Sequence, residues 1–144
     1  MTGKETMASI RNLILVLIVA ATPLNVAAQN LTCRPSEKSM LQVELLFGRN
    51  IGGRLGVSEK KWSRFVEAEI TPRFPQGLTV LEAGGQWRDT GNKRIVRERS
   101  KIVVLIVPAD TNSYERLDAI VAAYKDRFNQ QAVGMVARPV CTNL

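Results

Sequence analysis

Three cations alternate along one predicted strand of this chain. Arg97, Arg99 and Lys101 stand two residues apart in the stretch 94–107, which is wholly apolar after Lys101. Successive side chains of a strand point to opposite faces, so these three cations share a face. The opposite face is the more apolar one, and we expect the helices to cover it. The cations would then lie on the open face, where guanidinium groups bind anionic groups well.

The same predicted open face continues as Val103, Leu105 and Val107. A surface that is half basic and half apolar suits a partner, either a second subunit or a ligand with an acidic head. The plain alternative is a solvated strand face with a dimer contact at its apolar end. A homodimer through the open sheet face is therefore one expectation.

Glu98 lies between the cations and is expected to point toward the helices, near the end of the sheet. A carboxylate in that position needs a cationic partner, and Arg49 or Arg73 could supply the charge from a neighbouring loop. We favour a structural ion pair over a general acid or base, because structural networks also perturb carboxylates. Glu98 is thus a weak catalytic candidate.

An aromatic side chain completes the candidate site. Trp87 follows Gly84 and Gly85, where we expect a bulge or bend in the strand. This irregular strand makes Trp87 a better candidate to face a ligand than Trp62, which we expect in the core. The predicted ligand-binding residues are Arg49, Arg73, Trp87, Arg88, Arg97 and Arg99.

The composition excludes several chemistries. The chain has no histidine, which rules out Ser-His-Asp and Cys-His nucleophilic catalysis. Its two cysteines alone cannot build a zinc site, so no metal is expected. The glycine-rich stretch 48–56 lacks the spacing of a nucleotide fingerprint, and we interpret it as a flexible loop. No cofactor is expected, and an enzyme would rely on carboxylate, Tyr, Lys or Arg groups.

Hydrophobic periodicity predicts the element order β-α-β-β-α-β. The expected strands and helices cover 41–47, 58–70, 78–88, 94–107, about 111–128 and 132–140. This order is the signature of the ferredoxin-like α+β fold. The fold has a four-stranded antiparallel sheet of strand order 4-1-3-2, with two helices on one face.

The cysteines offer a test of that fold. The fourth strand would run antiparallel beside the first, which brings Cys33, before the first strand, close to Cys141, at the end of the fourth. We predict a Cys33–Cys141 disulfide, as suits an exported chain with an even number of cysteines.

The amino terminus predicts export. Residues 1–28 combine a short positive start, an apolar run and small residues before Ala28, the layout of a secretory signal peptide. Residues 29–144 would form a single domain in the periplasm or outside the cell, without a membrane span. They carry 18 Lys and Arg against 12 Asp and Glu, and the whole excess lies in 49–101.

Several segments resemble a known family. They are Val43–Arg49, Val57–Glu59, Trp62, Thr71–Thr79, Gly85–Arg88 and Arg97–Lys101. The chain is similar, over about residues 41–140, to small exported bacterial proteins of domain-of-unknown-function family 3574. The resemblance implies export and a single domain but no activity. It also suggests that these segments form one surface around the loop at Arg73.

Three functions remain open. The first is an exported binding module for an anionic small molecule or envelope component, held by Arg73, Arg97 and Arg99 with Trp87 as a stacking wall. Nucleic acid is not expected in that compartment. The alternative is a small, cofactor-free dimeric ferredoxin-like enzyme in which Glu98 or Tyr124 moves protons. The third is an envelope interaction protein without a small ligand.

Overall fold

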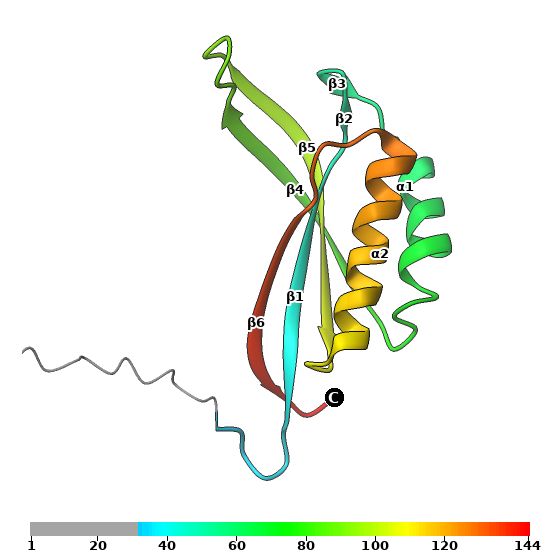
Figure 1. The fold of residues 1–144 in the computed structure, drawn as a ribbon, viewed down its shortest axis with the longest axis vertical. Helices are drawn as coiled ribbons and strands as arrows, with labels where there is room; N and C mark the ends of the chain where they lie inside the picture. The colour runs from blue at the N-terminus through cyan, green and yellow to red at the C-terminus, as the bar shows by residue number, and fades with distance from the viewer. Residues whose placement is uncertain (1–31) are drawn as a thin grey trace, which may run out of the picture.

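The fold centres on one antiparallel sheet. The structure is a computed structural model and describes residues 32–144; the predicted signal peptide and its cleavage after Ala28 lie outside the described residues. Four long strands form the sheet in the order β4-β5-β1-β6 (Figure 1). Their bounds are β1 Lys38–Gly48, β4 Thr79–Arg88, β5 Ile95–Val107 and β6 Gly134–Thr142.

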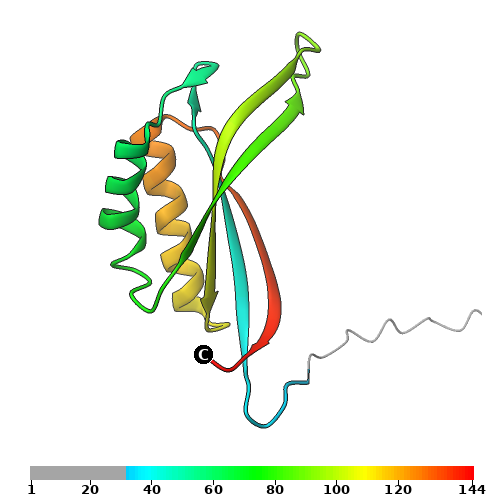
Figure 2. The ribbon, with the colours of Figure 1, turned by 180° about the vertical axis from the view of Figure 1, so that it is seen from behind.

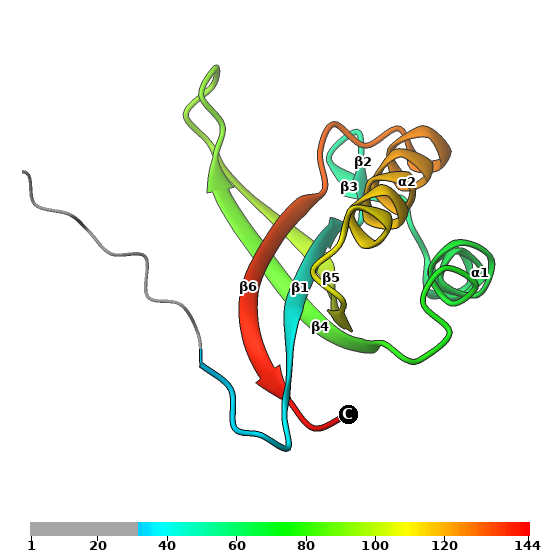
Figure 3. The ribbon, with the colours of Figure 1, turned by 60° about the horizontal axis from the view of Figure 1, so that its bottom comes forward.

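Two helical segments cover one face of this sheet (Figure 3). Helix α1 (Glu59–Phe65) continues as a π-helical turn, η1 (Val66–Ile70), and α2 spans Thr111–Phe128. The prediction of an α+β fold, with a four-stranded antiparallel sheet and two helices, is confirmed.

Local sequence sets the helix ends. Ser58 Oγ accepts a hydrogen bond from Lys61 N at 3.3 Å, and Asp110 caps α2 by accepting from Ser113 N at 2.7 Å. Pro72 follows η1 and disfavours helical geometry in the residue before it. Asn129 ends α2 with a left-handed φ of 49°, which turns the chain toward β6.

The core lies between the helices and the inner face of the sheet. Alternate β1 residues, from Leu41 to Phe47, are buried there. Five aromatic rings pack together around the end of β1, with edge-to-face or tilted geometry, and this arrangement favours a single packing of both helices. They are Phe47, Trp62, Phe65, Tyr124 and Phe128.

The covered face of β5 is the one opposite to our prediction. Lys101 and Val103 are buried at 3% and 0% exposure, whereas Ile102 is only partly buried on the open side. Both faces of this stretch are apolar, so alternation within β5 cannot choose between them. The register decides, because Val103 pairs with Leu45 of β1, whose buried face is unambiguous.

Two loop predictions also need correction. The expected bulge at Gly84 and Gly85 is absent, because β4 pairs with β5 in unbroken register from Thr79 to Arg88. The stretch predicted as a flexible loop contains a two-stranded ribbon, β2 (Asn50–Ile51) and β3 (Arg54–Leu55). We call it the β2–β3 ribbon.

One hairpin projects beyond the rest of the sheet. The last pair between β1 and β5 is Gly48 with Ser100, but β4 and β5 continue to pair as far as Arg88 and Ile95. Figures 1 and 2 show this part of the hairpin rising away from the helices. We call residues 84–99 the β-arm.

The predicted disulfide joins the amino-terminal segment to the edge strand. Cys33 and Cys141 are bonded, with Cα atoms 5.4 Å apart and a sequence separation of 108. The prediction is confirmed. Neither helix described in residues 32–144 is long and apolar enough to cross a membrane.

Candidate functional site

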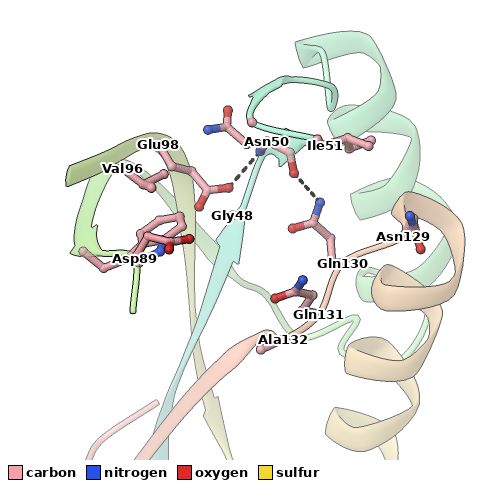
Figure 4. A pocket seen from close by; sticks show the side chains of 13 residues that line it. Gly48, Asn50, Ile51, Asp89, Val96, Glu98, Asn129, Gln130, Gln131 and Ala132 are labelled. Carbon is pink, nitrogen blue, oxygen red and sulfur yellow. Dashed lines mark hydrogen bonds between the residues drawn. The ribbon is translucent and has the colours of Figure 1, made fainter. Parts of the chain in front are cut away.

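Three hydrogen bonds converge on the end of β1. Tyr124 Oη donates to Gly48 O at 2.8 Å, Asn50 N donates to Glu98 Oε1 at 2.8 Å, and Gln130 Nε2 donates to Asn50 O at 2.6 Å. Figure 4 shows Glu98 and Gln130 reaching Asn50 from opposite sides. The bonds tie α2, β5 and the segment before β6 to one short piece of backbone.

A cavity of about 500 Å³ lies beside these bonds. The β-arm, the β2–β3 ribbon and the segment 129–132 between α2 and β6 form the walls of this open cavity (Figure 4). Its lining residues are Gly48, Asn50–Gly53, Trp87, Asp89, Val96, Glu98 and Asn129–Ala132. The volume falls within the range typical of small-molecule sites.

The polar side chains of this lining are carboxylates and carboxamides. Glu98 and Asp89 supply the carboxylates. The carboxamides belong to Asn50, Asn129, Gln130 and Gln131. Trp87 adds an indole that is 47% exposed. No Lys or Arg belongs to the lining. Within residues 32–144, no group of three His, Cys, Asp or Glu residues comes together as a metal site would require.

Gly48 makes room for Glu98. A Cβ at position 48 would lie 2.5 Å from Glu98 Oε1, well inside contact distance. Glu98 therefore lies on the open side of the sheet, and its carboxylate accepts a hydrogen bond from the backbone N–H of Asn50. The predicted orientation toward the helices and the ion pair with Arg49 or Arg73 are both wrong, because the inverted face of β5 turns Glu98 away from the helix layer.

Arg49 is a structural residue in this fold. It is 2% exposed, its Nε donates to Val57 O at 2.9 Å, and its guanidinium pairs with Glu59. Lys101 Nζ, on the same inner side, lies 2.8 Å from Glu59 Oε2 and also pairs with Glu82. Neither cation is accessible, so our placement of Lys101 on an open ligand-binding face is wrong.

The charges of this cluster shift pKa values. The hydrogen bond from Lys101 is the largest cause that holds the pKa of Glu59 below its usual 4.5, and Arg49 adds to it against the opposing effect of desolvation. Burial tends to lower the pKa of Lys101, but its bonds to Glu59 and Glu82 outweigh burial and raise it. Both shifts favour the ionised cluster.

Arg73 lies far from these groups along the helix. Its Nη1 donates to Glu69 O at 2.7 Å and lies 2.9 Å from Glu69 Oε2, after the end of η1. Arg49 pairs with Glu59 at the start of α1, so the two arginines flank opposite ends of this helical segment. The structure does not gather the family segments into one surface around Arg73.

The remaining predicted ligand-binding residues lie on the β-arm. Arg88, Arg97 and Arg99 are exposed, and Arg88 Nε donates to Lys93 O at 3.1 Å. Arg97 and Arg99 border a second, shallower groove of about 420 Å³ with Gly84, Gly85, Gln86 and Glu98. Their role in ligand binding stays a prediction.

Tyr124 cannot serve as an accessible proton donor. Its side chain is fully buried, and burial is the largest cause that raises its pKa. The residues that our prediction missed are the cavity residues Asn50, Asp89, Gln130 and Gln131. They come from separate loops and carry no motif spacing, so only the folded chain brings them together.

Solved structures show similar folds. A phage SAM lyase in complex with S-methyl-5'-thioadenosine matches with a TM-score of 0.57 at 10% identity, over 72% of this chain and 88% of that one. A phage SAM lyase in the apo state gives 0.56 at 16% identity, over 78% and 91%. CutA from Synechococcus elongatus PCC7942 gives 0.50 at 13% identity, over 74% and 83%. At these identities the likeness shows the fold alone.

The search of curated proteins found no match. A family model described as a protein of unknown function, DUF3574, matches residues 42–144. This stretch contains every strand of the sheet in whole or in large part, both helices and the β-arm. The chain therefore belongs to the DUF3574 family of proteins of unknown function.

Proposed function

We propose that this chain is an exported binding module that holds an anionic ligand or envelope partner on its β-arm. The observation that carries the proposal is the charge of the arm. Its exposed cations are Arg88, Lys93, Arg94, Arg97 and Arg99. Against these five stand only two acids in residues 84–99, Asp89 and Glu98.

Both acids already accept hydrogen bonds from the backbone. Asp89 Oδ1 accepts from Gly91 N and Asn92 N, each at 2.9 Å, and thereby shapes the hairpin turn. Glu98 Oε1 accepts from Asn50 N. Within the described residues, no carboxylate pairs with the guanidinium groups of Arg97 or Arg99, which leaves both cations available to a ligand.

The groove at the base of the β-arm suits close contact with an anion. Gly84 pairs with Arg99 in the ladder, and a Cβ at position 84 would meet nothing within 4 Å. A ligand can therefore approach the backbone opposite Arg99 and accept charge-assisted hydrogen bonds from the two arginines that line the groove. A projecting arm with one sign of charge also speeds encounter with anionic partners.

The disulfide supports an exported location. Such bonds persist in oxidising compartments, which agrees with a signal peptide over residues 1–28 and a mature domain over 29–144 in the periplasm or outside the cell. A partner in that setting would be an envelope component or a small anion rather than nucleic acid.

A homodimer through the open sheet face is part of the proposal. Leu81, Ile102 and Leu46 form one row across β4, β5 and β1, with Leu81 48% and Leu46 39% exposed. The nearby Glu44 and Arg138 pair with each other at 3.0 Å. A chain with a net positive charge would associate with a copy of itself most readily through such a neutral patch.

The cofactor-free enzyme remains a second candidate because Glu98 lines a cavity of small-molecule size beside Trp87. In that case Glu98 would be the general acid or base.

Binding of the purified, oxidised chain to immobilised dextran sulfate tests the proposal. The Arg97→Ala/Arg99→Ala double variant should bind at least tenfold more weakly, because each charge-assisted hydrogen bond contributes about 1.5–3 kcal/mol. The matched control is Lys60→Ala/Arg64→Ala, which removes two exposed cations from α1. Equal loss in both variants would contradict a role specific to the β-arm.

A further inference from the structure

The cavity beside Glu98 has a lining that does not suit the anion proposed for the β-arm. Its charged side chains are Glu98 and Asp89, and no cation belongs to the lining. An anion in this cavity would lose its hydration and face two carboxylates, both of which repel it. The cavity therefore needs a different class of ligand.

A cationic ligand is disfavoured by the surroundings. One oxygen of each carboxylate, Asp89 Oδ1 and Glu98 Oε1, accepts from backbone N–H groups, which offsets part of its negative charge. The five exposed cations of the β-arm lie on the same hairpin that forms one wall of the cavity. The positive electrostatic potential of the β-arm would repel a cationic ligand during its approach. Because the cavity carboxylates repel an anion and the arm repels a cation, a neutral ligand fits best.

The unpaired hydrogen-bonding groups of the cavity favour a ligand with hydroxyl groups. Within the described residues, Glu98 Oε2 and Gln130 Oε1 accept no hydrogen bond, while Gln130 Nε2 and Asn50 Nδ2 are engaged with backbone carbonyls. The site thus offers mainly acceptors, with further amide groups on Gln131. Hydroxyl groups both donate and accept, so a polyhydroxyl ligand satisfies these acceptors without bringing charge.

One wall is apolar and flat. The Trp87 indole is half exposed, and it pairs across the hairpin with Val96, which also lines the cavity. An indole packs well against the C–H face of a sugar ring while the ring hydroxyls point to polar groups on the other side. The cavity volume of about 500 Å³ accommodates one or two such rings.

We propose that the cavity formed by Trp87, Glu98, Asn50 and Gln130 binds a neutral carbohydrate, with the ring stacked on Trp87 and its hydroxyls donating to Glu98. This ligand is distinct from the anionic partner of the β-arm. The two proposals are separable because carbohydrate binding should be insensitive to salt, whereas binding to the β-arm should weaken as ionic strength rises.

Saturation-transfer NMR and tryptophan fluorescence on the full oxidised chain test the proposal. The probes are glucose, N-acetylglucosamine and their β-linked disaccharides, with adenosine and inorganic phosphate as comparison ligands. Trp62 is 4% exposed, so a sugar-dependent change in emission would come from Trp87. We expect binding of at least one sugar, unchanged between low and high salt.

Two variants locate the ligand. Trp87→Ala should weaken sugar binding at least tenfold, and Glu98→Gln, which keeps an acceptor for Asn50 N, should weaken it severalfold. The Arg97→Ala/Arg99→Ala variant should bind the same sugar as well as the wild-type chain does. Absence of binding by every sugar to the folded wild-type chain would overturn the proposal. Binding of adenosine or phosphate alone, or sugar binding that survives Trp87→Ala, would also overturn it.

Discussion

The carboxylate of Glu98 occupies the space that a side chain at position 48 would need. An added Cβ at Gly48 would lie 2.5 Å from Oε1 and 2.9 Å from Oε2 of Glu98. This contact holds the base of the β-arm against the end of β1, because the same carboxylate accepts a hydrogen bond from Asn50 N. The absence of a side chain at Gly48 therefore allows Glu98 to join the cavity lining to the end of β1.

Replacing Gly48 with alanine should displace the Glu98 carboxylate and leave Asn50 N without its partner. We expect a loss of about 1–3 kcal/mol in the free energy of unfolding, the usual cost of an unsatisfied donor, measured by urea denaturation. Gly84→Ala is the control, because its Cβ would meet nothing within 4 Å. A Gly48→Ala variant as stable as Gly84→Ala would contradict this account of the site.

Lys101 and Arg99 test how far the helices cover the inner face of β5, because the two residues share that face. Lys101 is 3% exposed and pairs with Glu59 and Glu82, whereas Arg99 is exposed two residues earlier. Lys101→Met should lower the free energy of unfolding by up to about 1 kcal/mol, because it removes the ion pairs with Glu59 and Glu82, whose exposed carboxylates water can then solvate. Arg99→Met should change it by less than about 0.5 kcal/mol. Equal effects in chemical denaturation would contradict a buried, paired Lys101.

Acid should destabilise the fold through Glu59. The bond from Lys101 and the charge of Arg49 keep its folded-state pKa below 4.5, so its contribution is present above that value. The contribution is lost as pH falls through the lowered folded-state pKa. Glu59→Gln should therefore lower the melting temperature at neutral pH and reduce its decline toward acid.

The matched control for that titration is Glu67→Gln. Glu67 is exposed on the same helical segment and forms no ion pair within the described residues. The control should follow the wild-type profile of melting temperature against pH. Parallel profiles for the Glu59 variant and the wild type would show that the cluster contributes nothing to the acid response.

The Cys33–Cys141 bond should restrict the unfolded chain. A loop of this length could contribute about 4–5 kcal/mol in the chain-entropy account, although measured gains are often smaller. Thiol labelling of the denatured, unreduced protein should detect no free cysteine. Cys33→Ser/Cys141→Ser should melt at a lower temperature, and an unchanged melting temperature would argue against a stabilising bond.

Much of the fold could be predicted from local patterns. Alternating Leu41 to Phe47 marked a strand with one buried face, and the helical periodicity after Ser58 and Asp110 marked both helices. The covered face of β5 could not be predicted from that strand alone, because residues 102–107 are apolar on both sides. Pairing Val103 with Leu45 resolves it, and this pairing is a property of the sheet rather than of the strand.

The candidate site was harder to predict for two physical reasons. The sequence shows that Arg49 is cationic but not that it is buried. It therefore predicts a ligand-binding residue, whereas in the fold Arg49 binds Val57 O and Glu59. Asn50 and Gln130 belong to no sequence motif that indicates a binding site. They are far apart in the sequence, and only the folded chain brings the Gln130 carboxamide to the backbone oxygen of Asn50. The exposed cations of the β-arm were predictable because they cluster in sequence as well as in space.

The salt dependence of polyanion binding tests the central claim most directly. Affinity for dextran sulfate is measured across a series of NaCl concentrations for the wild-type chain, Arg97→Ala/Arg99→Ala and Lys60→Ala/Arg64→Ala. The account predicts that the logarithm of affinity falls with salt for the wild type and the α1 control, and falls less steeply for the β-arm variant. Identical slopes for all three proteins would contradict binding through the β-arm.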